Sequence, residues 1–409
     1  MYKISQINPV RCFPIIFLAV FFISLFLWNS ATIADEDYWV GKKIQLINDL
    51  ETHNLNFNLS IHSTHPGTFP LLVSNLFPSN LFSPLRSIRL ACVLIDSFAT
   101  FFILFYVYKI YKNNLWLFVL ASLLLGGNYY LFTNPPDIVT AKLVGLAWII
   151  AFFHSIKQKD TPWCDTLILG ASIGLAFSSR IHMAMALIFL IPPLIWHYTS
   201  FKKMVLFLFA TVFIFFLTCP YLWYSPFFFL STSFAGVNYS INNDIALVGM
   251  RAYYYREVSI VELLLATPLA TASAISLLSL LTLKRKLFVS RIFLLSLFLV
   301  LVASIGLILK SSVNTMRYFY PAIFILHIFL PIFTMEILNT HIMHKLKLYS
   351  HLFLYTALCV LSLLLMLSTA GMIFNDTFLI FPPIIVHCGL TILFLLGNKK
   401  NRITTNKIL

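Results

Sequence analysis

Apolar runs long enough to cross a bilayer recur along this chain from one end to the other. A membrane-spanning helix needs roughly 20 predominantly apolar residues. Only 10% of the 409 residues are charged, against about 25% in soluble proteins. We therefore predict an all-α, polytopic membrane protein, a single integral membrane domain covering residues 1–409. About 12 transmembrane helices are expected, near residues 12–34, 87–108, 115–133, 138–156, 166–179, 182–199, 204–219, 260–283, 292–309, 318–338, 350–372 and 378–396.

The fifth and sixth runs form one long apolar stretch that Arg180 and His182 interrupt. An unbroken helix would leave Arg180 in lipid, where a charged side chain is costly. We therefore expect a hairpin that turns at this point.

Lys and Arg are distributed unequally between the two sides of the membrane. Short cytoplasmic loops collect these residues. With the N-terminus inside, 18 of the 28 lie in inner segments, 9 lie in outer segments, and Lys142 lies within the fourth run. The first run is expected to be an uncleaved signal anchor. The net charge of +14 is then explained by topology and by contact with membrane lipids, and we expect no nucleic-acid partner.

Three consecutive acids, Asp35, Glu36 and Asp37, follow the first apolar run in a chain that holds only 14 acids. They open the first outer loop, residues 35–86; a second long outer loop covers residues 220–258. Helix capping alone explains one acid at such a position, but hardly three. The cluster indicates a membrane enzyme rather than a passive bundle.

An amphipathic helix is predicted directly after these acids. One side carries apolar residues at helical spacing, and the other side is polar. Such a helix would lie in the outer membrane interface, with the acids at its positive end. The apolar side holds Val40, Ile44, Ile47 and Leu50; the polar side holds Lys42, Lys43, Asn48 and Asp49.

Four further motifs lie on the predicted outer side, in a fixed order. They are His65-Pro66-Gly67 before the second run, Asn134-Pro135-Pro136-Asp137 before the fourth, Gly170-x-x-x-Gly174 closing on Arg180, and Arg317-Tyr318-x-x-Pro321. Together with Asp35-Glu36-x-Tyr38, they resemble the polyprenol-phosphate-sugar glycosyltransferases of the GT-C fold. Within that superfamily the chain is similar to protein O-mannosyltransferases and lipid A aminoarabinose transferases. Many relatives have a second proline where this chain has Gly67.

The resemblance implies a GT-C-like fold and a reaction that transfers a sugar from a polyprenyl-phosphate carrier to an acceptor hydroxyl, with inversion. It implies Asp35 as general base and Glu36 as its neighbour; Asp37 competes for the base role. Arg180, Arg317 and His65 would hold the phosphate. The acceptor would be a glycan, a lipid or a protein. No cofactor is firmly implied, and a divalent metal stays open.

The residues themselves fit this chemistry. A carboxylate at a partly dry interface has a raised pKa, which suits a general base. Arginine side chains stabilise charge on a departing phosphate through charge-assisted hydrogen bonds. Asp137 follows two prolines that favour an extended turn. There it would either orient the acceptor or sugar, or cap the following helix.

Asp96 lies near the middle of the second run, and Lys142 in the fourth run is its expected partner. Intramembrane acids are functional candidates by default, and a proton-coupled transporter would use one. A twelve-span lipid-linked oligosaccharide flippase or secondary transporter is therefore the alternative. A structural ion pair is favoured, because Asp96 is the only acid at that depth. The expected location is the bacterial inner membrane, or the endoplasmic reticulum in a eukaryote.

Overall fold

A computed structural model of the 409-residue chain describes residues 36–52, 68–111, 135–157, 162–197, 200–224, 268–282, 290–310 and 320–338, with a few single positions besides. Every regular element in these ranges is a helix, which confirms the all-α prediction for this part of the chain. Three of the helices are long and apolar enough to cross a membrane: Pro84–Ile110, Asp137–Ile156 and Phe201–Thr218.

The helices follow the predicted apolar runs closely. The runs near 12–34, 115–133, 350–372 and 378–396 lie outside the described residues. The helices are α2 (Glu36–Glu51), α4 (Thr68–Ser74), α5 (Pro84–Tyr111), α7 (Pro135–Lys157), α8 (Trp163–Ser179), α9 (Ile181–Ala184), the 3-10 helix η2 (Met185–Leu190), α10 (Ile191–His197), α11 (Phe201–Thr218), α12 (Tyr221–Tyr224), α16 (Pro268–Thr282), α17 (Arg291–Lys310) and α18 (Tyr320–Leu338).

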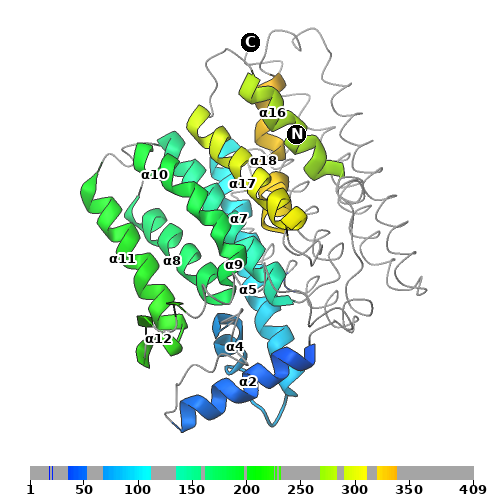
Figure 1. Ribbon diagram of the computed structural model, residues 1–409, viewed down its shortest axis with the longest axis vertical. Helices are drawn as coiled ribbons and strands as arrows, with labels where there is room; N and C mark the ends of the chain where they lie inside the picture. Colours follow the sequence, from blue (N-terminus) through cyan, green and yellow to red (C-terminus); the bar gives the residue numbers. More distant parts are fainter. Residues whose placement is uncertain are drawn as a thin grey trace, which may run out of the picture.

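Helix α7 is the central helix of this bundle and α11 is peripheral (Figure 1). In α7, 94% of the membrane-length window is buried, and the helix packs against α5, α8 and α18. In α11 the buried share is 6%, and its Phe209 and Phe213 side chains are exposed. A helix that is apolar all round and exposed on most sides is typical of contact with lipid.

Two glycines let α11 approach α8 closely. A Cβ atom on Gly174 would lie 2.7 Å from the backbone oxygen of Thr211, and one on Gly170 would lie 2.7 Å from the Cβ atom of Ala210. Small residues spaced four apart permit such backbone contact between membrane helices. The Gly170-x-x-x-Gly174 motif therefore has a packing role that fixes the direction of α8.

The helix break predicted at Arg180 is confirmed. Helix α8 ends at Ser179, Arg180 is extended with φ −153° and ψ 107°, and α9 begins at Ile181. From there α9, η2 and α10 lead back along the bundle (Figure 1).

Each pair among α5, α7 and α8 is joined by polar contacts, at a different depth for each pair. Asp96 on α5 and Lys142 on α7 lie 2.5 Å apart, which confirms the predicted ion pair, and Lys142 Nζ also donates to Thr100 Oγ1 at 3.1 Å. Asp137 of α7 contacts Arg180 at the end of α8. Asp165 of α8 contacts α5. The three helices are thus linked in a closed triangle.

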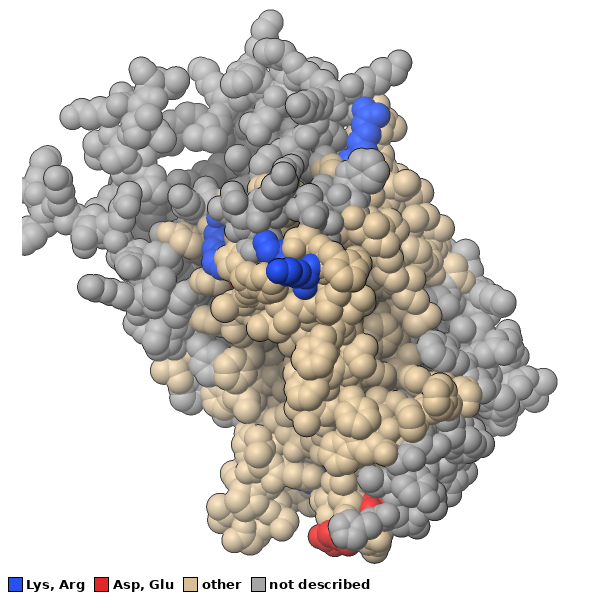
Figure 2. Space-filling view, turned by 90° about the vertical axis from the view of Figure 1, so that its left-hand side faces the viewer, with Lys and Arg blue, Asp and Glu red and all other residues tan. Residues whose placement is uncertain are grey.

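On one face of the molecule, surface charges separate along the long axis, although Arg86 at the start of α5 is exposed as well. Figure 2 shows Lys and Arg in the upper half and Asp and Glu at the lower end, where Figure 1 places α2. Lys202, at the start of α11, and Glu51, at the end of α2, are exposed examples of each kind. This separation agrees with the basic inner side and acidic outer side that the loops predict.

Candidate functional site

Helix α2 packs against α4 and α5 with a face that the sequence pattern did not predict. Trp39, Lys42, Lys43 and Leu46 are buried, whereas Ile44 is 48% exposed. The prediction that Lys42 and Lys43 lie on the water-facing side of the helix is therefore wrong. The same side of the helix carries Trp39 and Leu46, which pack in the hydrophobic core. Lys43 turns inward with them because it gains Ser74 and Ser87 as hydrogen-bond partners, and Ile44 turns outward.

Polar contacts at two points hold α2 in this orientation. Lys43 Nζ donates to Ser87 Oγ on α5 and to the carbonyl oxygen of Ser74 at 3.3 Å. Further along, Tyr221 Oη on α12 donates to Asp49 Oδ2 at 3.1 Å. Burial lowers the pKa of Lys43. Burial also raises the pKa of Asp49, and the hydrogen bond from Tyr221 opposes that rise.

Asp137 lies inside the first turn of α7, which begins at Pro135. The two prolines therefore start the helix rather than form an extended turn before it, and the N-cap interpretation of Asp137 is also wrong. Proline suits the first helical position because its missing N–H has no helical partner there. An acid in the first turn also interacts favourably with the helix dipole.

The carboxylate of Asp137 meets the guanidinium of Arg180 beneath α2. Arg180 Nε and Asp137 Oδ1 lie 2.5 Å apart, a close ion pair without the alignment of a good hydrogen bond. Arg180 is 1% exposed and Asp137 is fully buried. These two residues come from separate motifs of the sequence, and the fold brings them together.

A tryptophan ring of α2 adjoins this ion pair. Arg180 Cζ lies 5.1 Å from the centre of the Trp39 ring, and Lys42 Nζ lies 5.5 Å from it. We call Trp39, Lys42, Asp137 and Arg180 the outer cluster. It holds two cations and one acid, all of them buried. Arg180 Nη1 has no hydrogen-bond partner among the described residues, and a buried donor in that state is expensive.

The segment that follows the His65-Pro66-Gly67 motif is bonded to the same region. Thr68 Oγ1 contacts the carbonyl oxygen of Ser178 at 3.3 Å and that of Thr218 at 2.8 Å. These carbonyls belong to the last turns of α8 and α11, which lack helical partners. Thr68 therefore joins α4 to the helix end that carries Arg180.

The side chains of the other predicted site residues are not among those that the structure describes. Asp35, His65 and Arg317 fall in undescribed ranges, and for Glu36 and Asp37 the backbone alone is described. Their backbone forms the first turn of α2, so the acids do stand at the positive end of that helix, as the sequence predicts.

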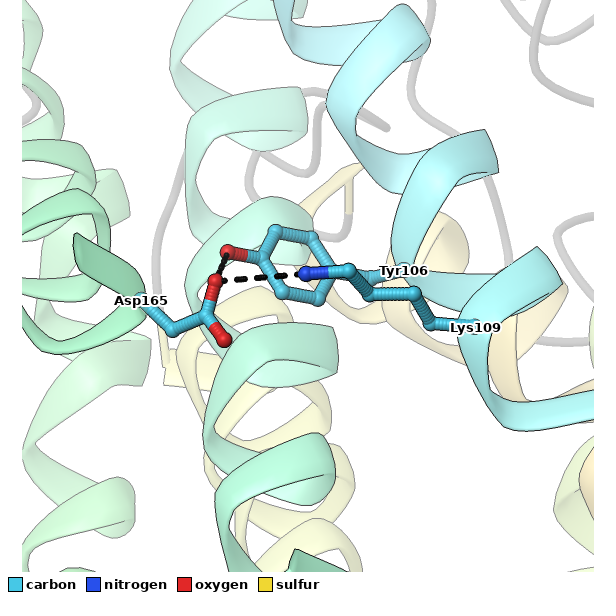
Figure 3. Close-up of polar contacts among 3 residues, drawn as sticks. All are labelled: Tyr106, Lys109 and Asp165. Atoms are coloured by element: carbon cyan, nitrogen blue, oxygen red, sulfur yellow. Dashed lines mark hydrogen bonds and ion pairs between the residues drawn. The ribbon is translucent and has the colours of Figure 1, made fainter. Parts of the chain in front are cut away.

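A second polar cluster lies at the opposite ends of α5 and α8 (Figure 3). There Tyr106 Oη donates to Asp165 Oδ1 at 2.7 Å, and Lys109 Nζ lies 3.5 Å from the same oxygen. The ammonium of Lys109 also lies over the rings of Phe105 and Phe153, at 4.3 and 5.2 Å. We call Tyr106, Lys109 and Asp165 the inner cluster. Sequence analysis missed it, although an acid beginning an apolar run at the inner side was a usable signal.

The chemistry open to the outer cluster is the binding of an anion. Buried arginine and lysine side chains that lie against the same ring are groups of the kind that bind phosphate or carboxylate. Across the described ranges there is no group of three His, Cys, Asp or Glu side chains that could hold a metal ion. The outer cluster itself contributes a single carboxylate, already paired with Arg180.

Comparisons with known proteins give no relative from which a function could be transferred. No family model, no curated protein and no solved structure matches this chain.

Proposed function

We propose that this protein is a membrane glycosyltransferase of GT-C-like fold with about twelve spans. It would move a sugar from a polyprenyl-phosphate carrier to an acceptor hydroxyl on the periplasmic or luminal face. The proposal rests chiefly on the contact between Asp137 and Arg180. These residues belong to two of the motifs that carry the family resemblance, and they meet beneath the helix whose first turn contains Glu36 and Asp37.

The roles follow from the charges. An acceptor hydroxyl needs a base, and a carboxylate at the membrane surface supplies one; we assign this role to Asp35, with Asp37 as its competitor. The departing phosphate needs cationic donors. Arg180 has an unused Nη1, and Arg317 and His65 would complete the set. Asp137 holds the guanidinium of Arg180 in place.

The test is sugar transfer in vesicles that contain the purified protein and a polyprenyl phosphate carrying a labelled sugar. Asp35→Asn removes the base but keeps the size of the side chain, so transfer should fall by about 10²–10⁴-fold. Asp49→Asn is the matched control. Asp49 lies on α2 but contacts Tyr221 instead of the outer cluster, so this variant should transfer sugar at the normal rate.

Three results would count against the assignment. Full transfer by Asp35→Asn together with loss in Asp37→Asn moves the base to Asp37. Full transfer by both variants, or no transfer by the unmodified protein with any polyprenyl-linked sugar, rejects the glycosyltransferase proposal.

A transporter or lipid-linked oligosaccharide flippase is the second candidate, because of the ion pair between Asp96 and Lys142. Both side chains are fully buried, on α5 and α7, where a transporter could use protonation to drive a conformational change. If the pair is structural, the double variant Asp96→Asn/Lys142→Met keeps sugar transfer in the same vesicles. If the protein is a transporter, this variant loses substrate movement and the unmodified protein transfers no sugar.

A further inference from the structure

Two exposed leucines lie in the connection between α4 and α5, residues 75–83, which we call the α4–α5 loop. Leu76 is 73% exposed and Leu81 is 70% exposed. The loop repeats one short motif, Asn75-Leu76-Phe77 and then Asn80-Leu81-Phe82, and it contains no charged residue. Large apolar side chains gathered on a protein surface mark a contact with lipid or with a partner.

The loop is folded on itself by tight turns. The backbone N–H groups of its four large apolar residues, Leu76, Phe77, Leu81 and Phe82, donate to carbonyl oxygens within four positions in sequence, at 3.1–3.2 Å. The rings of Phe77 and Phe82 also meet edge to face, with their centres 6.0 Å apart. A segment that enters an apolar environment needs partners for its backbone polar groups. These four N–H groups have theirs within the loop and the end of α4.

Both ends of the α4–α5 loop are attached where candidate spans begin or end. On one side, Thr68 of α4 contacts the carbonyl oxygen of Thr218 at 2.8 Å, and Thr218 is the last residue of the span Phe201–Thr218. On the other side, the span Pro84–Ile110 begins directly after the loop. Figure 1 shows α4 and the start of α5 together beside α2. The loop therefore lies at a surface of the membrane.

The length of α5 places the loop at the level of the lipid headgroups. Arg86 is exposed near the start of the helix, and the side chain of Lys109, near its end, is 31% exposed. Between these cations the helix rises about 35 Å, at roughly 1.5 Å per residue. That is more than the roughly 30 Å of the hydrocarbon core and less than the roughly 40–45 Å of the whole bilayer. Ser83, the last loop residue, accepts a hydrogen bond from the backbone N–H of Arg86 at 3.4 Å, so the loop adjoins this layer.

We propose that the α4–α5 loop is a lipid anchor, in which Leu76 and Leu81 insert into the leaflet on the side of α2. An apolar side chain that starts in the headgroup layer reaches the acyl boundary, where leucine is stable. A docked protein is the other explanation for exposed leucines. Lipid is the better occupant, because the loop is attached to spans at both ends and offers no charge that would select a soluble partner.

Such an anchor would hold the outer helices at the membrane surface. Ser74, the last residue of α4, accepts a hydrogen bond from Lys43 of α2 through its carbonyl oxygen at 3.3 Å. The anchored loop would therefore fix the height of α4 and, through this contact, of α2. A transferase and a transporter would both have use for it.

The experiment locates the leucine positions with a fluorescent amino acid, placed at 76 or at 81 in the full-length protein in phosphatidylcholine nanodiscs. Two quenchers are compared: a nitroxide on the lipid acyl chain near the headgroup, and iodide in the water. The nitroxide should quench both probes as strongly as a probe at Phe213, which is exposed on α11. Iodide should quench them weakly. A probe at Glu51, exposed at the end of α2, is the control for water and should show the reverse.

A probe at a third position tests whether the leucines are the anchoring groups. Ser79 is exposed and lies between them in sequence. In Leu76→Asn/Leu81→Asn, quenching of a probe at 79 by the lipid nitroxide should fall to the level of the Glu51 probe. Leu76→Met/Leu81→Met is the matched control, because it keeps apolar side chains of similar size, and it should leave the quenching unchanged.

Three outcomes overturn the proposal. The first is strong quenching by iodide at 76 and 81 without quenching by the lipid. The second is protection of both positions from both quenchers, which would mean that protein covers the leucines. The third is lipid quenching at 79 that persists in the asparagine pair. Unfolding temperatures identify any variant that fails to fold, and if a probe at 76 does so, the probes at 79 and 81 decide between the same outcomes.

Discussion

The outer and inner clusters both tie α8 to a neighbouring helix, but they differ in their contact with water. In the outer cluster Lys42, Asp137 and Arg180 are all at most 1% exposed. In the inner cluster the side chain of Lys109 is 31% exposed and that of Asp165 is 5% exposed. The inner cluster pairs Lys109 with Asp165, and in the outer cluster Asp137 pairs with Arg180.

This difference in exposure bears on how much each cluster contributes to stability. An ion pair that only joins two helices gains little from complete burial, because the loss of hydration offsets most of the attraction. The inner cluster fits that role: Lys109 keeps contact with water and with aromatic rings. The outer cluster keeps both members of its ion pair, Asp137 and Arg180, almost completely away from solvent.

The largest expected effect comes from removing the acid of each cluster. Asp137→Ala leaves Arg180 buried without its counter-ion and should lower the free energy of unfolding by about 3–5 kcal/mol. Asp165→Ala should cost about 1–3 kcal/mol, since it leaves one buried tyrosine hydroxyl unpaired while Lys109 turns to water. Thermal unfolding in detergent measures both. Equal losses would remove the distinction between the clusters.

A smaller effect should follow from changing α8, which carries Asp165 and ends just before Arg180. In Gly174→Ala the new methyl group meets the backbone oxygen of Thr211 at 2.7 Å and the backbone nitrogen of Phe215 at 2.9 Å, and backbone atoms do not give way easily. We expect a net loss of about 1–3 kcal/mol in the free energy of unfolding.

Gly306→Ala on α17 is the control for the intrinsic preference of alanine in a helix. The added methyl group there has no atom within 4 Å, so this variant should gain up to about 1 kcal/mol. A stabilised Gly174→Ala protein would show that α8 and α11 are packed less closely than described.

The smallest expected effect concerns the inner cluster alone. Tyr106→Phe removes the hydrogen bond to Asp165 Oδ1 and should lower the free energy of unfolding by about 0.5–1.5 kcal/mol, with sugar transfer unchanged. Tyr108→Phe, two residues further on α5 and half-buried, should be neutral. A loss of transfer in Tyr106→Phe would assign the inner cluster a role beyond stability.

Sequence patterns predicted the helices well in the part of the chain that the structure describes. A long apolar run in a membrane has few alternatives to a helix, because its backbone groups must be hydrogen-bonded within the segment. They also predicted the break at Arg180 and the pairing of Asp96 with Lys142, since a charge in lipid must be excluded or compensated. The orientation of α2 could not be predicted. Apolar spacing says which residues share a face, but only the tertiary structure shows that Lys43 gains hydrogen-bond partners on α4 and α5.

The candidate site was predicted in part. Asp137 and Arg180 were both named, yet their contact depends on how α7 and α8 cross, which no local pattern encodes. Lys42 and Trp39 were missed as site residues because an amphipathic helix at a membrane surface ordinarily turns lysine outward. The spacing of Trp39, Lys42 and Leu46, three and four residues apart, was a usable signal for one common face.

The contacts of the Thr68 hydroxyl limit where residues can be inserted into this chain. It binds the carbonyl oxygens of Ser178 and Thr218, the latter 150 positions away in sequence. An insertion before Thr68 lengthens a connection and leaves that junction in place. An insertion within Thr68–Ser74 would shift every later residue of α4 away from the ends of α8 and α11. Natural variants of this protein should therefore differ in length before Thr68 rather than within Thr68–Ser74.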